Sequence, residues 1–301
     1  MVTKRFYYGG QAVVEGVMMR GRQTMATAVR RSDGGLAIDT QPLPAIYTGW
    51  MRKAPLIRGV IVLIEALVLG IKSLLYSANI SLEEEDEEVS GGQLGLIMAV
   101  ALAFSVALFF ILPLFLTRLF HFSSSLVFNL VDGVIRVAIL ITYLKLMILV
   151  PDIKRTFAYH GAEHAVVNAY ETGAPMELEA VRGHSKEHVR CGTSFMFVVM
   201  VISILVFSLV GLRSVWLMVL SRIVLIPVIA SLSYEIIYFG GRHTGNALVR
   251  AVLAPGLWLQ SLTTREPDDS QLEVAIAALG KVVEIEEGKP EQIGDAGTSS
   301  Q

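Results

Sequence analysis

The chain has 301 residues, of which 53% are apolar and only 17% are charged, and its mean hydropathy is +0.57. Ordinary globular chains have roughly 25% charged residues, so this composition is typical of a membrane protein. The net charge of −2 argues against a nucleic-acid-binding protein. The single cysteine, Cys191, excludes a disulfide-based fold.

Four apolar stretches are long enough to be transmembrane helices, and they lie at residues 94–116, 126–150, 195–212 and 215–232. The first has no charged residue and makes about 34 Å of helix, whereas the hydrocarbon core of a bilayer is about 30 Å thick. We therefore expect a mainly α, polytopic membrane protein with about four transmembrane helices in two hairpins.

The distribution of positive residues predicts the orientation. Twenty of the 25 Lys and Arg residues precede the first span, lie between the hairpins or follow the last span, whereas two lie in the short loops within the hairpins. Positive residues are retained on the cytoplasmic side. We predict a multi-pass protein of the cytoplasmic (inner) membrane with both termini and the central loop cytoplasmic. Its expected partner is the lipid bilayer, and a homo-oligomer or a membrane-protein partner stays open.

Charge and turn patterns divide the chain further. Arg58, Glu65 and Lys72 recur every seven residues, which places them on one stripe of a helix. This stripe indicates a helix lying along the membrane interface or a helix that lines a pore or faces a partner. A turn signal at 32–35 between two strand-like stretches predicts a β-hairpin. The predicted segments are a β-rich cytoplasmic region (1–55), an interfacial amphipathic helix (56–76), an acidic linker (77–93), the first hairpin (94–150), a cytoplasmic loop with a candidate metal site (151–194), the second hairpin (195–232), a cytoplasmic C-terminal region (233–288) and a disordered tail (289–301).

Four charged residues fall inside the predicted spans, Lys145 and the three that are candidate functional groups. Asp132 and Arg136 are four residues apart in the second span, and Arg222 lies in the fourth. A charge in the bilayer is costly and marks a cavity, a partner or a polar seam between helices. A structural ion pair and a role in transport explain them equally well.

The central loop carries the chemistry. His160, Glu163 and His164 form an H-x-x-E-H string, the inverted order of the H-E-x-x-H metalloprotease motif. On a helix, residues i and i+4 share a face, so both imidazoles can bind one divalent ion, for which zinc is the expected metal. Glu163 is the candidate general base.

A second cluster follows in the same loop. His188 and Cys191 form H-x-x-C directly before the third span, where Thr193 or Ser194 is the expected N-cap. A helix N-terminus lowers the pKa of a nearby thiol and favours the metal-binding thiolate. Cys191 or His188 is the preferred third ligand, because Glu171 lies about 10 Å beyond His164 along a straight helix. The additional candidate ligands are Glu171, His184 and His243.

Four stretches resemble the signature stretches of one bacterial membrane family: YGGQAVVEGVMMRG at 8–21, YHGAEH at 159–164, HVRCGTSF at 188–195 and TTREP at 263–267. It is the YqhQ-like family, domain-of-unknown-function family 1385, which is labelled a predicted metal-dependent enzyme. The resemblance implies membrane location and a metal site and gives no substrate. In the first stretch, the polar residues Gln11, Glu15 and Arg20 are suited to line a cleft or an interface.

Two functions of different classes fit these patterns. The first is a metal-dependent hydrolase acting at the cytoplasmic membrane face on a peptide or a lipid-linked substrate, with Glu163 as base. The alternative is a non-enzymatic transporter, channel or membrane-assembly factor with a structural metal site. Three protein ligands favour the first reading, and a complete His160, His164, His188 and Cys191 shell favours the second.

Overall fold

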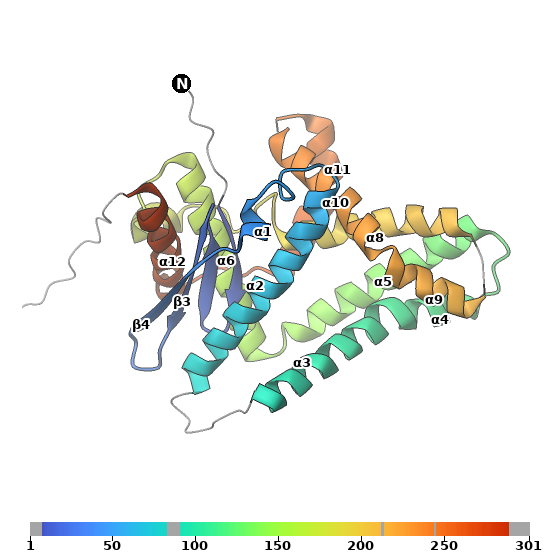
Figure 1. The fold of residues 1–301 in the computed structure, drawn as a ribbon, viewed down its shortest axis with the longest axis horizontal. Helices are drawn as coiled ribbons and strands as arrows, with labels where there is room; N and C mark the ends of the chain where they lie inside the picture. Colours follow the sequence, from blue (N-terminus) through green and yellow to red (C-terminus); the bar gives the residue numbers. More distant parts are fainter. Residues whose placement is uncertain (1–7, 83–90, 212–213, 244, 289–301) are drawn as a thin grey trace, which may run out of the picture.

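The structure, a computed structural model, describes residues 8–82, 91–211, 214–243 and 245–288. A small sheet with its covering helices forms one end of the molecule, and a bundle of apolar helices forms the other (Figure 1). The predicted fold class, mainly α with a small β-rich N-terminal region, is confirmed. The acidic run at 83–88 and the predicted tail at 289–301 lie outside the described residues.

The sheet is an antiparallel meander in the order β1-β2-β3-β4. Its strands are β1 (Gly9–Val13), β2 (Gly16–Arg20), β3 (Thr24–Arg30) and β4 (Leu36–Pro42). The last two strands form the hairpin that the turn signal predicts. The short helix α1 (Ala45–Thr48) then leads the chain away from the sheet.

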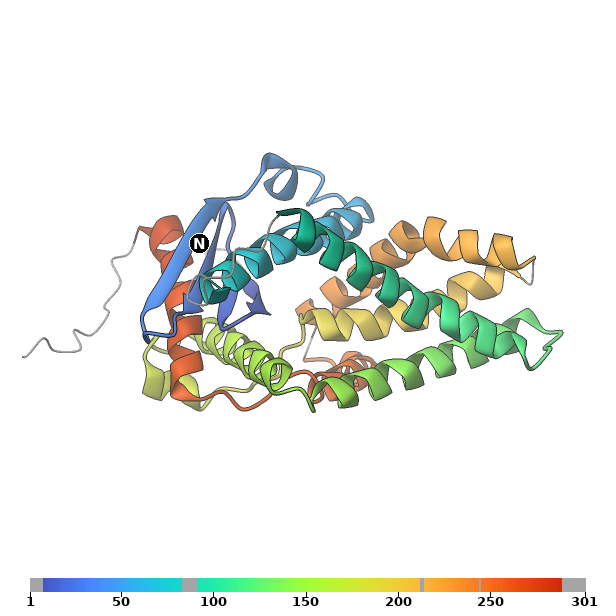
Figure 2. The ribbon, with the colours of Figure 1, turned by 90° about the horizontal axis from the view of Figure 1, so that it is seen from below.

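Helices cover both faces of the sheet (Figures 1 and 2). They are α6 (Pro151–Thr172) and α12 (Asp269–Glu287) on one face and α2 (Ile57–Leu82) on the other. In β2, Val17 and Met19 pack into the core with α6 and α12, whereas Met18 packs with Ile61 of α2. Because both faces are covered, β2 is apolar at successive positions and lacks the polar alternation of a strand with one solvent face.

The bundle contains the predicted spans. Its elements are α3 (Gly91–Val106), the π-helical turn η1 (Ala107–Ile111), α4 (Leu112–Arg118), α5 (Ser125–Met147), α8 (Gly192–Val210), α9 (Val215–Val224), α10 (Ile226–Arg242) and α11 (Ala247–Gln260). Three stretches, Gly95–Arg118, Ser125–Met147 and Gly192–Val210, are long and apolar enough to cross a membrane and coincide with the first three predicted spans. These helices indicate a multi-pass membrane protein.

The fourth predicted span, 215–232, differs from the prediction. It is divided at Leu225 into α9 and α10, which are bent by 47°. Pro227 lies in the first turn of α10, where its ring and missing N–H prevent the helix from continuing unbroken. The second half then extends to Arg242, beyond the predicted end.

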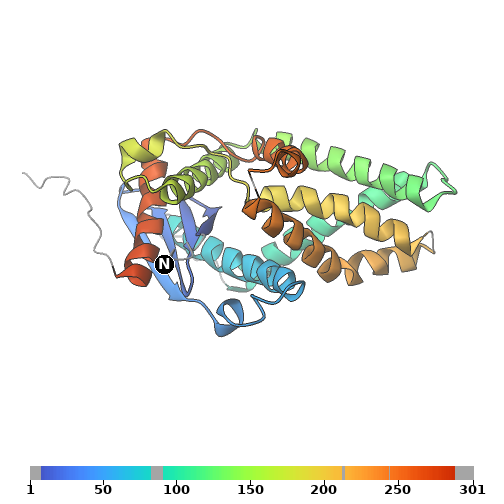
Figure 3. The same ribbon diagram turned by 90° about the horizontal axis from the view of Figure 1, so that it is seen from above.

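Helix α2 is longer than the predicted interfacial helix at 56–76. Its stretch Ile57–Ser81 also satisfies the length and hydropathy of a span, so the described residues contain four candidate spans, or five if the bent pair counts as one. The helix runs obliquely between the sheet and the end of the bundle (Figures 1 and 3). Its placement along the interface stays a prediction.

Candidate metal centre

Helix α6 carries the H-x-x-E-H string through the middle of the protein. It begins at Pro151, which needs no hydrogen-bond partner in the first turn, and it ends at Gly173, whose φ of +80° is the left-handed conformation that glycine favours. Tyr159 and Ala162 are fully buried and pack into the core of the sheet. The string therefore lies on a buried helix held at both ends.

Three of the predicted ligands meet at one point. One ligand atom each of His160, His164 and Cys191 lies within 4.8 Å of the other two. The Sγ atom of Cys191 lies 3.3 Å from Nε2 of His160, and the two imidazole centroids are 4.4 Å apart. Histidine nitrogen and cysteine sulfur are the ligands that zinc prefers, and this donor set fits a divalent metal ion.

Backbone carbonyl groups fix the orientation of both imidazoles. Nδ1 of His160 lies 2.9 Å from the carbonyl oxygen of Thr263, and Nδ1 of His164 lies 2.7 Å from that of Lys186. A carbonyl oxygen only accepts, so each Nδ1 is the donor, and in a neutral imidazole this leaves Nε2 as the nitrogen that can bind a metal ion. Metal-binding histidines are held in this way in proteins.

Cys191 is positioned by the start of α8. It is itself the N-cap of this helix, and its Sγ atom accepts a hydrogen bond from the backbone N–H of Thr193 at 3.4 Å. The N-cap predicted at Thr193 or Ser194 is therefore wrong by two or three positions, because the sulfur takes the role expected of a hydroxyl. The first turn of α8 therefore fixes the position of the sulfur.

Glu163 lies next to the three ligands. Its side chain is buried, and Oε2 lies 3.3 Å from Nε2 of His164, although the carboxylate is not one of the three mutually close ligand groups. Strand β1 lies against it, since a Cβ atom added to Gly10 would come within 2.9 Å of Cγ of Glu163. The carboxylate is thus held beside the ligand atoms without being among them.

His188 and Glu171 form a neighbouring pair. The ring of His188 is 5.8 Å from that of His164, and its Nε2 lies 3.7 Å from Oε2 of Glu171, which also pairs with Arg190. Burial raises the pKa of Glu171, but the hydrogen bond to His188 and the charge of Arg190 outweigh it and hold the pKa below its ordinary value. His188 and Glu171, both predicted ligands, therefore pair with each other beside the three mutually close ligand groups.

The other candidate ligands make local contacts. His184 lies 3.0 Å from the carbonyl oxygen of Ala180, in the short helix α7 (Leu178–Arg182), and 3.1 Å from the hydroxyl of Thr172. His243 contacts the carbonyl oxygen of Phe239 at the end of α10 and stacks on its ring. Neither belongs to the group of mutually close ligand atoms.

Comparison with known proteins agrees with the motifs on this helix and loop. Residues 54–285 match the family model described as "Protein of unknown function (DUF1385)". A protein of Bacillus subtilis (strain 168), named "Uncharacterized protein YqhQ", is 36% identical over 297 residues, which cover 93% of each chain. The chain belongs to this family. No solved structure matches it.

The polar residues of the first family stretch connect the sheet to its neighbours. Gln11 donates to the carbonyl oxygen of Ala66 in α2 at 3.2 Å, and Arg20 pairs with the buried Glu65 of α2 at 2.8 Å. Tyr159 of α6 donates to Glu15 at 3.3 Å, and burial raises the pKa of this tyrosine to about 12. These side chains line the interfaces of the sheet with α2 and α6.

Three charged residues inside the bundle form one buried cluster. Asp132 and Arg136 of α5 pair at 2.9 Å, and Arg222 of α9 reaches the same carboxylate at 3.2 Å. All three side chains are buried. The cluster joins the two helices and lies apart from the metal centre, since α5 and α9 contribute none of its ligands.

Sequence reasoning missed two residues that build the centre. Gln260, fully buried, binds the backbone N–H and carbonyl of His188 and the hydroxyl of Ser194, so it holds the loop to α8. Gly161 allows the backbone at Arg265 to cross α6, because a Cβ atom there would lie 2.0 Å from the carbonyl oxygen of Arg265. The available sequence signal for Gln260 is an amide residue at the end of the apolar helix α11.

The crossing at Gly161 predicts the effect of a small substitution. Gly161→Ala displaces the backbone at Arg265 and lowers the free energy of unfolding by about 1–3 kcal/mol, the usual cost of overpacking. The matched control is Gly183→Ala, because a Cβ atom there meets nothing within 4 Å, and it changes stability by less than about 0.5 kcal/mol. Denaturant unfolding in mild detergent measures both, and equal midpoints would contradict the assigned crossing.

Proposed function

We propose that this chain is a membrane-embedded, metal-dependent hydrolase in which His160, His164 and Cys191 hold a divalent ion. The observation that carries the proposal is that both imidazoles are fixed by a backbone carbonyl on Nδ1 while ligand atoms of His160, His164 and Cys191 lie within 4.8 Å of one another. The nitrogen and sulfur donors make zinc the expected metal. Three protein ligands leave one position of a tetrahedral ion for a reactant, as in catalytic zinc sites.

The chain's own groups supply the rest of the chemistry. A bound zinc ion is a Lewis acid that polarises a carbonyl or phosphoryl oxygen and makes water acidic near neutral pH. Glu163, whose Oε2 lies 3.3 Å from Nε2 of His164, is the group placed to accept the proton of the attacking water. A peptide or a lipid-linked substrate fits this chemistry at a membrane surface.

The alternative function is a transporter, channel or assembly factor with a structural metal. The buried Asp132, Arg136 and Arg222 cluster favours it, since charges within a bundle accompany ion pathways in many transporters. Against it, a structural zinc site is closed by four protein ligands. His188, the expected fourth, lies beside Glu171. Three mutually close ligand groups therefore support a catalytic metal site over a structural one.

We also propose that the metal centre and both termini are cytoplasmic. The described parts of the segments that precede the first span, connect the hairpins and follow the last span, which hold 17 Lys and Arg residues, gather at the sheet end of the molecule, while the ends of the α4–α5 and α8–α9 hairpins lie at the opposite end (Figures 1 and 2). The two ends of the described chain are also close, since Tyr8 donates to Glu287 at 3.3 Å. The positive-inside rule supports this orientation.

Metal analysis tests the ligand set. The purified full chain should carry about one zinc or similar ion, and the double change His160→Ala and His164→Ala should reduce the metal to background. His184→Ala is the matched control, because this histidine makes only local contacts, and it should retain the ion. Elemental analysis by mass spectrometry gives the content, and a metal-loaded double variant would refute the assignment.

The change Glu163→Gln separates an enzyme from a scaffold. It keeps the shape and removes the base, so metal content and stability should stay near wild type while activity falls by roughly 10²–10⁴-fold. Complementation of a strain lacking the gene reports this loss. The exposed Glu187 provides the control Glu187→Gln, which should complement normally. Full complementation by metal-loaded Glu163→Gln would remove the support for a hydrolase.

Cysteine labelling tests the orientation. Ser123→Cys, in the loop before α5, should react with an impermeant maleimide added to intact spheroplasts, and Ser185→Cys, in the central loop, should react only after lysis. Both positions are exposed, and the lone native Cys191 is buried, so the wild-type chain gives the background. The reverse labelling pattern would place the metal centre on the outer side.

A further inference from the structure

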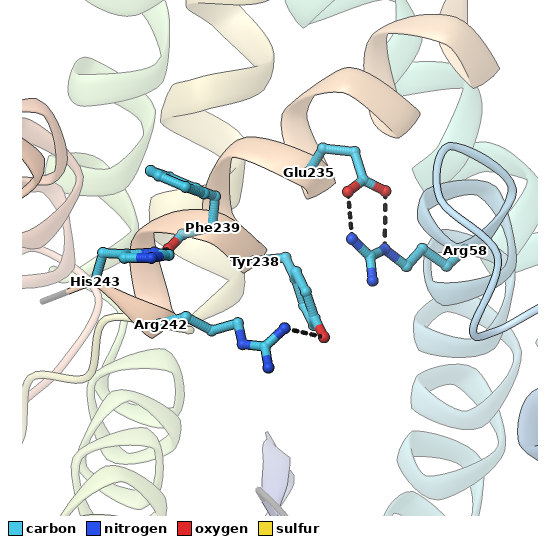
Figure 4. Close-up of a pocket in the computed structure, with 6 residues that line it drawn as sticks. All are labelled: Arg58, Glu235, Tyr238, Phe239, Arg242 and His243. Carbon is cyan, nitrogen blue, oxygen red and sulfur yellow. Dashed lines mark hydrogen bonds and ion pairs between the residues drawn. The ribbon is translucent and has the colours of Figure 1, made fainter.

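A second site lies where α10 meets the beginning of α2. It is a pocket of about 400 Å³ (Figure 4). Its lining residues are Arg58, Glu235, Tyr238, Phe239, Arg242 and His243. Arg58 comes from the first turn of α2, and the others lie on the last turns of α10 or directly after it. None of the ligands of the candidate metal centre contributes to it.

The pocket has an excess of positive charge. Arg58 is neutralised by Glu235, at 2.8 Å between Nε and Oε1, and its guanidinium lies 3.7 Å from the ring centroid of Tyr238. Arg242 donates to the hydroxyl of Tyr238 at 3.0 Å, and within the described residues it has no carboxylate partner. Figure 4 shows its guanidinium directed toward the hydroxyl of Tyr238. One arginine is therefore available to an anion.

The residues around this positive pocket are apolar and exposed. Phe239 in the lining is 57% exposed, and Leu56 and Ile57, which directly precede Arg58, are 53% and 43% exposed. Large apolar side chains beside an arginine are typical of the boundary between hydrocarbon and headgroups. The end of α10 lies at the sheet end of the bundle, where the positive segments gather (Figure 1).

We propose that this pocket binds the phosphate group of an anionic phospholipid. Basic pockets between membrane helices bind lipid headgroups through such arginines. In this site Arg242 supplies the charge, the Tyr238 hydroxyl is held beside it, and the exposed apolar residues contact the acyl chains. A free phosphate offers the same anion without those chains. The proposal is independent of the metal centre, and the binding of lipid tests it.

Native mass spectrometry of the detergent-purified full chain tests the proposal with added phosphatidylglycerol. The wild type should retain this lipid several-fold more tightly than phosphatidylcholine, and Arg242→Gln should weaken its binding roughly fivefold, the value of one interfacial arginine. Arg250→Gln is the matched control, because Arg250 is an exposed arginine on α11 outside the pocket, and it should bind as the wild type does. Both variants change the net charge equally.

Three results would overturn the proposal. The first is equal retention of the two lipids by the wild type. The second is an equal loss of phosphatidylglycerol in both arginine variants, which would indicate a general charge effect. The third is full displacement of the lipid by inorganic phosphate or glycerol phosphate at millimolar concentration, which would assign the pocket to a soluble phosphate. Unchanged unfolding midpoints of both variants confirm that the comparison concerns folded protein.

Discussion

The contact between α6 and the chain that leaves α11 is the constraint on which the candidate metal centre depends. At Gly161 the two backbones touch, and the backbone N–H of Arg265 donates to the carbonyl oxygen of Phe157 at 2.9 Å. The same segment places the carbonyl oxygen of Thr263 on His160. The crossing at Gly161 therefore joins α6 to the segment between α11 and α12. The same segment orients the imidazole of His160.

The sequence predicts the parts of this structure that depend on periodicity and leaves open those that depend on tertiary contacts. Hydropathy locates three spans, and the i, i+4 spacing places His160 and His164 on one face of a helix. It does not decide between His188 and Cys191 as the third ligand, because the loop between α7 and α8 has no regular period. The two carbonyl groups that orient the histidines carry no signal at all, since every residue has one.

The sheet explains the family stretch at its start. The apolar residues of this stretch pack on both faces of the sheet, and its polar residues bind neighbouring helices. Gln11 and Arg20 bind α2, and Glu15 accepts a hydrogen bond from Tyr159 of α6. A buried polar group is costly unless it is hydrogen-bonded, so these partners are required by their position. Gly10 brings β1 against Glu163, which makes the sheet one wall of the candidate centre. The polar residues of this stretch thus hold the sheet, and with it the strand beside Glu163, against the neighbouring helices.

The end of α10 lines the pocket shown in Figure 4, and it also contacts Arg190, which lies beside the metal centre. Gly241 packs against Arg190, since a Cβ atom there would lie 3.1 Å from Cγ of that arginine. Arg190 pairs with Glu171 and directly precedes Cys191, the N-cap of α8. Thermodynamic reciprocity then gives a definite consequence: if an anion in the pocket shifts this helix end and alters metal affinity, the metal must alter anion affinity by the same factor. Such coupling requires that the connecting element has two arrangements that both ligands distinguish.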